Sequence, residues 1–371
     1  MSAIFPVVRS YGLRGPTAEE VMVANRGIAP GFDFVRVALS LVVILLHSFH
    51  TAYGLAPMVV LATNWSAPLW GATLPIFFAL SGFLVTGSAL HSRSLSIFLG
   101  LRVLRIVPAL AVEISLSALI LGPLLTVIPI KDYFSDRQFI TYFFNIFGWI
   151  HYQLPGVFTS NPLANVVNLS LWTLHPELLS YVVMTVLMIS GLAYRRGPLT
   201  AVWIVMTTML MAYNAWTGRF DLAGVYKGPV LIYYFFTGVV AYHWRNIIVL
   251  NKVLFCVAVI MSYVLLRIAS STFILLPFTL TYIMVFMGMR RLPLPSALKS
   301  GDYSYGLYLY AFPVQQAIVQ FAPWAREWWI VFPLATIATY VIARLSWHLI
   351  EKPILRFKPL LTNRGGRAAR V

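Results

Sequence analysis

Apolar runs of about 20 residues recur along the whole chain, and this repetition constrains the fold more than any other feature of the sequence. A helix of about that length is what crosses the hydrocarbon layer of a bilayer. Hydrophobic residues make up 60% of the 371 residues, and charged residues only 10%. A soluble protein needs more polar side chains than this to cover its surface. The sequence therefore predicts an all-α, polytopic transmembrane helical bundle and excludes a soluble protein.

Ten stretches are interpreted as membrane spans. They are 33–53, 68–90, 102–127, 171–193, 199–216, 229–244, 252–268, 273–290, 303–322 and 327–350. One further apolar run, 139–150, has only twelve residues, which suits a short re-entrant or interfacial helix better than a crossing. The spans define a transmembrane domain at 32–353, which lies between an N-terminal tail at 1–31 and a basic C-terminal tail at 354–371.

The distribution of basic residues predicts which side of the membrane each loop faces. The formal net charge is +16, which in a membrane protein indicates Lys and Arg gathered in cytoplasmic loops, and no nucleic acid is expected as a partner. With ten spans and a cytoplasmic N-terminus, nineteen Lys and Arg residues fall inside and six outside. If 139–150 crossed the bilayer, every later loop would change sides and the basic C-terminal tail would face outward. Both termini are therefore expected in the cytoplasm.

Ionisable side chains within the spans are the strongest functional signal, because charges in a membrane are costly and usually face a cavity. Arg36 and His47 lie eleven residues apart in the first span, about three helical turns, so both lie on nearly one face. Arg36 is then at the cytoplasmic mouth and His47 in the outer half. Glu177, about two turns into the fourth span from its outer end, shares the depth of His47. This pattern predicts a carboxylate and an imidazole paired for acid–base chemistry.

Two arginines in the motif RVLRIVPA form a second signal. Arg102 and Arg105 are three residues apart on one helical face at the cytoplasmic mouth, where Arg36 could join them. Arginine forks match phosphate oxygens, so the group could clamp a phosphate; the alternative is an ordinary anchor at the inner membrane surface. In the second span, Ser81 and Gly82 belong to a small, weakly polar face. Such a face is typical either of close helix packing or of a groove that admits a slender chain.

Polar and aromatic side chains at the outer ends of the spans could bind an acceptor. The loop HYQLPGVFTSNPLANVVNLS has no charge but carries amides and aromatic rings that could hydrogen-bond to and stack on sugars, unless it is an ordinary connection. Gln315 and Gln316 are adjacent near the outer end of the ninth span and would suit sugar hydroxyls. Trp172 and His175, at the outer end of the fourth span, are assigned to the same acceptor site.

Six motifs follow one another along the chain. They are the Arg36 and His47 spacing, FFALSGFL, RVLRIVPA, LWTLHPELLSYV, DYSYGLYLYAFPVQQ and SWHLIEKP. From about Phe32 to Pro353 this order resembles the membrane acyltransferase family 3, the bacterial glycan O-acyltransferases. The resemblance implies a multi-pass protein of the bacterial inner (cytoplasmic) membrane, an acyl-CoA donor drawn from the cytoplasm, and a carbohydrate acceptor at the outer face. It also implies essential roles for Arg36, His47, Arg102 and Arg105, and the acidic position of the family's fourth span falls on Glu177.

The residues and the resemblance together predict an integral-membrane O-acyltransferase. It would move an acyl group, acetyl by default, from acyl-CoA to a hydroxyl of a carbohydrate or glycolipid acceptor. The donor-binding residues would be Arg36, Arg102, Arg105, Ser81 and Gly82. His47 would act as general base or carry the acyl group transiently, and Glu177 would orient it. Acyl-CoA is then a co-substrate, no permanently bound cofactor or metal is expected, and a separate extracytoplasmic partner or a second copy could assist.

Three other classes of protein stay open on the sequence alone. A transporter or exporter of a sugar or acyl compound would also carry polar residues at mid-depth, although no paired discontinuous spans occur in matching halves. A metalloenzyme could bind zinc through His47, His50, His175 and Glu177, yet two histidines three residues apart are commonly just one polar face. The third class is a structural membrane scaffold.

One further group of ionisable residues lies in SWHLIEKP, near the cytoplasmic end of the last span. Arg344, His348 and Glu351 recur there at helical spacing. The spacing is typical of an ion-pair cluster along one side of a helix, which would be structural. The alternative is that the group helps to bind the donor.

Overall fold

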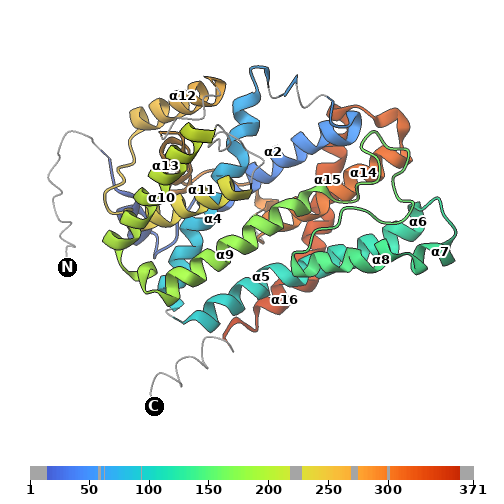
Figure 1. Cartoon of the computed structure of the whole chain (residues 1–371), viewed down its shortest axis with the longest axis horizontal. Coiled ribbons are helices and arrows are strands. Elements are labelled where there is room, and N and C mark those ends of the chain that lie inside the picture. The colour runs from blue at the N-terminus through green and yellow to red at the C-terminus, as the bar shows by residue number, and fades with distance from the viewer. Residues whose placement is uncertain are drawn as a thin grey trace, which may run out of the picture.

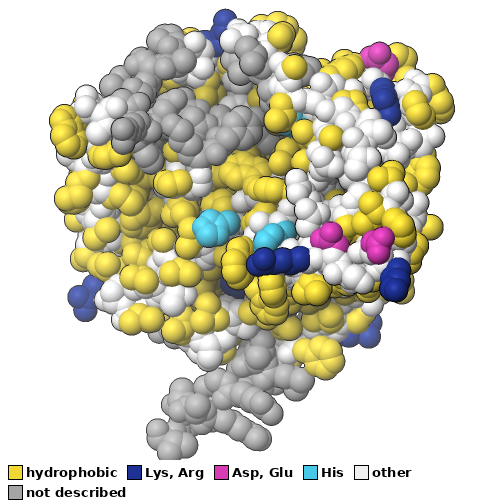
Figure 2. Space-filling model, turned by 45° about the vertical axis from the view of Figure 1, so that its right-hand side comes forward, with side chains coloured by type: hydrophobic (Ala, Val, Ile, Leu, Met, Phe, Trp, Pro, Cys, Tyr) yellow, Lys and Arg dark blue, Asp and Glu magenta, His cyan; other side chains and the backbone are white. Residues whose placement is uncertain are grey.

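The computed structural model describes residues 15–56, 60–61, 63–92, 94–217, 228–268, 275–298 and 301–359. Within these ranges the regular secondary structure is helical, apart from an isolated bridge between Thr17 and Val249 (Figure 1). Figure 2 shows a face covered largely by hydrophobic side chains, with few charged ones between them. Many large hydrophobic residues are exposed along the helices, an arrangement that is unfavourable in water and favourable in lipid. The predicted all-α membrane fold is confirmed.

Each predicted span coincides with a helix. The helices are α2 (Phe32–Tyr53), α4 (Ala67–Ser92), α5 (Leu95–Leu116), α9 (Leu174–Ile189), α10 (Arg196–Thr217), α11 (Gly228–His243), α12 (Lys252–Ile268), α13 (Leu275–Gly288), α14 (Ser304–Phe321) and α15 (Trp328–Ser346). Six helical stretches of the described chain are long and apolar enough to cross a membrane, namely Phe32–Tyr53, Ala67–Ser92, Leu95–Leu125, Leu169–Ile189, Arg196–Thr217 and Trp328–Leu355. The protein is thus polytopic, while the total of ten spans and the cytoplasmic termini stay predictions.

Two of the long helices contain a π-helical turn. α5 continues through the π turn Ser117–Leu121 into α6 (Gly122–Leu125), and α15 continues through the π turn Trp347–Glu351 into α16 (Lys352–Leu355). Such turns shift the register of a helix and occur frequently at functional sites. Each of these turns is associated with a buried acid, because Ser117 donates a hydrogen bond to Glu113 and the second turn ends at Glu351 itself.

The short apolar run at 139–150 forms α8 (Arg137–Tyr142) followed by a 3₁₀ helix at Phe143–Phe147. Together they are roughly 19 Å long, well short of the hydrocarbon thickness of about 30 Å. The preceding helix α7 (Ile130–Ser135) is tied to the π turn of α5 by the Tyr133 hydroxyl, which donates to the carbonyl of Ala118 at 2.7 Å. In Figure 1 these short helices lie beside α6. Their length supports a segment that does not cross the bilayer.

A glycine contact joins α4 to α11. A methyl group placed on Gly82 would overlap the carbonyl oxygen of Phe235, and one placed on Gly238 would overlap that of Ala79. Small residues let membrane helices approach this closely. Gly82 is therefore a packing residue on the face of α4 that meets α11, and its assignment to the donor site stays a prediction.

The remaining helices arrange the ionisable residues around one inner region. α2 packs against α14 and α15, while α5 and α9 run side by side (Figure 1). The start of α2, the first half of α5, the residues before α14 and the end of the α15 extension come together there. These are helix ends that ten alternating spans would put on the same side of the membrane, so their meeting agrees with the predicted alternation.

The predicted N-terminal tail contains a docked helix, α1 (Ala18–Ala24). Its N-cap is a capping box in which the Thr17 hydroxyl and the Glu20 carboxylate each accept the other residue's backbone N–H. Ala18 is fully buried and donates to the carbonyl of Ile248, and Glu19 forms an ion pair of 2.8 Å with Arg245. The helix is therefore fixed to the turn that follows α11.

Candidate active site

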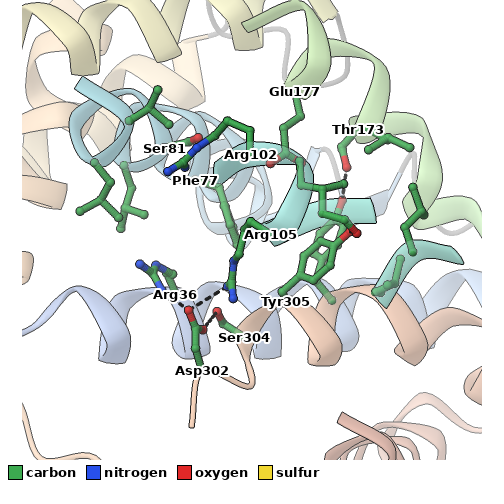
Figure 3. A pocket seen from close by; sticks show the side chains of 18 of the residues that line it. Arg36, Phe77, Ser81, Arg102, Arg105, Thr173, Glu177, Asp302, Ser304 and Tyr305 are labelled. Atoms are coloured by element: carbon green, nitrogen blue, oxygen red, sulfur yellow. Dashed lines mark hydrogen bonds and ion pairs between the residues drawn. The ribbon is translucent and has the colours of Figure 1, made fainter. Parts of the chain in front are cut away.

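A cavity of ≈ 410 Å³, called the inner cavity below, lies among α2, α4, α5, α9 and α14 (Figure 3). Its charged lining consists of Arg36, Arg102, Arg105, Lys358, Glu177 and Asp302. Four of these side chains are cationic and two are acidic, so the cavity carries an excess of positive charge. Ser81 also lines it, as expected for a groove wall. The structure thus brings together all three arginines that the sequence assigned to the donor.

Asp302, just before α14, holds two of the arginines in place. Its Oδ2 lies 2.7 Å from Nη1 of Arg36 and 2.8 Å from Nη2 of Arg105, and its Oδ1 accepts a hydrogen bond from the Ser304 hydroxyl (Figure 3). Burial acts to raise the pKa of Asp302, but the neighbouring Arg105 and Arg36 outweigh it and lower the pKa to about 2. Asp302 is therefore ionised at neutral pH. Sequence reasoning overlooked it, although an acid directly before an apolar span was visible in GDYSYG.

Arg102 differs from the other two arginines because its charge is not matched by an acid. Its Nη2 donates to the Ser88 hydroxyl at 3.2 Å, and its guanidinium lies 5.8 Å from the centre of the Phe98 ring. Among the described residues, no carboxylate is within 4.0 Å of it, and its buried Nε has no hydrogen-bond partner. A buried donor without a partner is costly, so this side chain is prepared to bind an anion.

The acid of the SWHLIEKP motif also reaches this region. Glu351 is 2% exposed, and its Oε2 lies 3.7 Å from Nη1 of Arg105. His348 instead contacts the Tyr303 hydroxyl at 3.3 Å, and Arg344 is exposed. The three residues therefore do not act as one cluster, because Glu351 contacts Arg105, His348 contacts Tyr303 and Arg344 is exposed.

Glu177 faces the inner cavity and not His47. It lines that cavity together with the arginines (Figure 3). Its Oε1 accepts a hydrogen bond of 2.7 Å from the Tyr181 hydroxyl. The expected pair of Glu177 with His47 is not formed in this structure. Equal depth in two helices does not fix the direction in which each side chain points, because the rotation of each helix is set by its packing.

His47 lies in a second cavity of ≈ 320 Å³, called the histidine cavity below. The two cavities share Leu74 and Tyr308 in their walls, so they adjoin. The imidazole is 5% exposed; its Nδ1 lies 3.4 Å from the Ser170 hydroxyl, and the Phe312 ring meets it edge-on at 5.0 Å. Ser170 also lines the inner cavity. A buried imidazole therefore lies directly beyond the arginine-lined space.

A buried hydrogen-bond network positions Ser170 against His47. The Asn168 side chain accepts from the Ser170 backbone N–H at 3.0 Å and donates to Glu113 Oε1 at 3.0 Å and to the carbonyl of Leu309 at 2.9 Å. Asn168 is fully buried, and Glu113 is 1% exposed. The network links α5, the segment before α9 and α14. Sequence reasoning missed it, although the single acid Glu113 inside the apolar third span was a signal.

The four residues assigned to the acceptor lie in different environments. Trp172 lines the histidine cavity, whereas His175 is exposed on the first turn of α9. Gln315 is fully buried and donates to the carbonyl of Ile44 and the hydroxyl of Ser48. Gln316, equally buried, donates to the carbonyls of Leu163 and Val166 and accepts from Asn161.

The two glutamines therefore tie elements of the bundle together, and their role in acceptor binding stays a prediction. The side-chain amide of Gln315 contacts α2, and that of Gln316 contacts backbone carbonyls of the loop before α9. His175 lies at the surface, outside the lining of both described cavities, and its role in acceptor binding also stays a prediction. Trp172 alone of the four lies where an acceptor could approach His47.

The zinc alternative needs four side chains that the structure separates. The His47 and His50 rings are 5.6 Å apart, but Glu177 lies in the inner cavity and His175 is at the surface. In the described part of the chain, no group of three or more His, Cys, Asp and Glu side chains is arranged to hold a metal ion.

The fold and the site define a multi-pass helical membrane protein in which a cationic inner cavity adjoins a buried histidine. The sequence also matches the family model of the acyltransferase domain over residues 30–348. The chain therefore belongs to the membrane acyltransferase family 3, and it is an acyltransferase. The predicted family and enzyme class are confirmed.

Two curated relatives match nearly the whole chain. Nodulation protein 10 of Rhizobium leguminosarum bv. viciae is 30% identical over 378 residues, which cover 94% of this chain and 98% of the relative. A protein named O-acetyl transferase from Shigella phage Sf6 is 28% identical over 351 residues, which cover 89% of this chain and 98% of the relative. No solved structure matches.

Proposed function

We propose that this enzyme transfers an acyl group, acetyl in the first instance, from cytoplasmic acyl-CoA to a hydroxyl of a carbohydrate acceptor at the outer face of the membrane. The observation that carries the proposal is the junction of the two cavities at Leu74 and Tyr308. It gives an anionic thioester a cationic binding site within reach of a buried base. The similarity to a protein named O-acetyl transferase supports acetyl as the group transferred.

The inner cavity would bind the nucleotide end of acyl-CoA. Arg102, the arginine without an acidic partner, would meet phosphate oxygens with its fork, and Arg36 and Arg105 would present theirs from the Asp302 anchor. Lys358 would add a further cation at the same cavity. The thin pantetheine arm would then run past Ser81 and Tyr308 toward His47, which is about 16 Å along α2 from Arg36.

At the end of that arm His47 would act as general base. Its Nδ1–H would donate to the Ser170 hydroxyl, which leaves Nε2 free to accept the proton of the acceptor hydroxyl. The hydroxyl oxygen would form a bond to the thioester carbonyl carbon as the carbon–sulfur bond breaks. The departing thiolate would take the proton back from Nε2, so that His47 is regenerated. Formation of an acyl-His47 intermediate is the alternative to be tested.

The first test of this function is His47→Ala in purified protein supplied with radiolabelled acetyl-CoA, together with mass spectrometry of surface glycans from cells that make the variant. We expect glycan acylation to fall about 100-fold or more, the usual contribution of a general base. Acetyl-CoA affinity should stay within about threefold of the wild-type value, because His47 lies outside the inner cavity.

The matched control is His91→Ala, which removes an exposed histidine at the end of α4 and should leave both measurements unchanged. Full glycan acylation by His47→Ala would overturn the proposal, as would wild-type protein that adds no acyl group to any surface glycan. A rapid acid quench followed by peptide mass spectrometry would reveal an acetylated His47 if the acyl group is carried covalently.

A further inference from the structure

A third cavity, of ≈ 830 Å³, opens at the outer end of α2. Aromatic rings form a large part of its wall, and they belong to Phe49, Tyr53, Trp65, Trp70 and Trp328. We call it the aromatic cleft. Trp70 lines both the aromatic cleft and the histidine cavity, so the three cavities form a series from the inner arginines to the outer end of α2.

Contacts position four of the five rings of the aromatic cleft, namely those of Phe49, Tyr53, Trp70 and Trp328. Phe49 stacks on Trp328 with ring centres 4.9 Å apart and an interplanar angle of 18°, and it meets Trp70 edge-on at 6.3 Å. The indole N–H of Trp70 donates to the Ser66 hydroxyl at 2.9 Å. At the rim, the Tyr53 hydroxyl donates to the carboxylate of Glu327. The cleft thus offers flat apolar faces beside polar groups.

His50 carries an unused hydrogen-bonding group at the inner end of this route. The side chain is 6% exposed, and its Nδ1 is buried without a hydrogen-bond partner among the described residues. It lines the histidine cavity, where its ring centre is 5.6 Å from that of His47. Buried polar atoms are nearly always paired in proteins, so His50 is expected to pair with a ligand. A hydroxyl group that enters the histidine cavity would provide this partner.

We propose that the aromatic cleft and His50 form the acceptor subsite and that its ligand is a sugar ring. This inference rests on the proposed function, which requires a neutral hydroxyl to reach His47. The sugar would lie against Trp70 and the stacked pair of Phe49 and Trp328, and it would place one hydroxyl between His50 and His47. Aromatic side chains suit such a ligand because they combine a flat apolar face with a polar edge.

The direction of entry follows from the charges of the two ends. The inner cavity carries the excess of cations that an anionic donor needs, so a donor bound there closes that side. The aromatic cleft has no Lys, Arg, Asp or Glu in its described lining. A neutral acceptor is therefore favoured at the cleft, and it meets the thioester at His47 from the opposite side.

The test compares two replacements at each of two tryptophans. Trp70→Phe and Trp328→Phe keep an aromatic face, whereas Trp70→Leu and Trp328→Leu keep only apolar volume. Glycan acylation is measured by mass spectrometry at equal membrane levels of each variant, and acetyl-CoA affinity is measured on the purified protein. We expect the Leu variants to lose about tenfold in glycan acylation and the Phe variants to stay within about threefold of wild type. All four should bind acetyl-CoA with unchanged affinity.

Trp329→Leu is the matched control, because Trp329 follows Trp328 in α15 but is 59% exposed and lies outside the cleft lining. It should have no effect. His50→Phe should lower glycan acylation without changing acetyl-CoA affinity. His50→Asn, which keeps a hydrogen-bonding group, should be more active than His50→Phe but less active than wild type.

Two results would overturn the assignment. If the Leu and Phe variants were equally active, the cleft would bind a lipid chain or nothing. If His50→Phe were fully active, the unpaired Nδ1 would have no part in acceptor binding. Should one tryptophan position fail to give protein in the membrane, the other position and His50 decide the outcome. Wild-type protein that acylates no glycan would instead refute the proposed function, whereas active wild type with unaffected cleft variants refutes the acceptor subsite alone.

Discussion

The inner cavity and the histidine cavity adjoin, yet they treat charge in opposite ways. Arg36 and Arg105 share the carboxylate of Asp302 in the inner cavity, and Arg102 is left without an acid. The described lining of the histidine cavity contains no Asp, Glu, Lys or Arg, and its polar groups are those of His47, His50, Thr73, Trp70, Trp172 and Tyr308. One region is built to hold an anion, and the other can admit only neutral groups at low cost.

This difference shows how one chain can separate binding from chemistry. Phosphates would stay at the inner arginines, while the thioester and the hydroxyl, both neutral, would meet at His47. In a site with little water, a base and its substrate are not screened from one another, so an imidazole held by Ser170 and Phe312 is effective there. Substitutions in the inner cavity should therefore lower donor affinity, whereas substitutions around His47 should lower the turnover rate.

Apart from His47→Ala, the largest expected effect belongs to the inner cavity. Arg102→Ala should weaken acetyl-CoA binding by roughly 10- to 100-fold, because hydrogen bonds to a charged partner contribute about 1.5–3 kcal/mol. The turnover rate at saturating donor should stay within about threefold of wild type, since His47 is untouched. Isothermal titration and initial rates measure the two quantities.

Arg195→Ala, which removes an exposed arginine of the loop before α10, is the control and should change neither. Arg102→Lys keeps the charge but loses the fork, so it should fall between wild type and Ala. Equal donor affinity in wild type and Arg102→Ala would contradict the division between the two cavities.

A smaller effect is expected from the hydrogen-bond network of Glu113, Asn168 and Ser170, which positions Ser170 against His47. Asn168→Ala removes the side chain that holds the Ser170 turn, and it should lower the turnover rate about tenfold while donor affinity is unchanged. Glu113→Gln retains an oxygen for Asn168 and Ser117, so it should keep most of the activity, whereas Glu113→Leu should not.

If the Asn168 network only stabilised the fold, Asn168→Ala would not lower turnover while leaving donor affinity unchanged. If Asn168→Ala lowered donor affinity and turnover in parallel with its thermal stability, the network would support the whole bundle and not the position of His47. Membrane levels and melting temperatures of the three variants provide that comparison.

The smallest effect concerns pH. Asp302→Asn should lower the melting temperature by a few degrees, because Arg36 and Arg105 lose their shared carboxylate. The pKa of Asp302 is lowered to about 2, so its stabilisation is complete above the ordinary carboxyl pKa and is lost only as pH falls through about 2. The difference in melting temperature between wild type and Asp302→Asn should therefore be constant from about pH 5 to 8. A difference that shrinks toward pH 5 would show that Asp302 is not held ionised by the two arginines.

The sequence by itself determined the membrane class, the positions of the helices and the residue types at the inner site. Apolar length and the scarcity of charge are local properties, and lipid leaves a chain few structures other than helices. The three arginines could be placed together because all lay near ends of predicted spans on the same side. His47 could be singled out because a histidine inside an apolar span is rarely without a purpose.

Only the tertiary structure decided which side chains meet. Glu177 turns to Tyr181 and the arginines, Gln315 and Gln316 are used inside the bundle, and Gly82 packs against α11. The rotation of each helix about its axis depends on contacts with neighbouring helices. The sequence of a single span does not specify those contacts. For the same reason the Asp302 anchor and the Ser170 contact with His47 appeared only when helices distant in sequence were packed together.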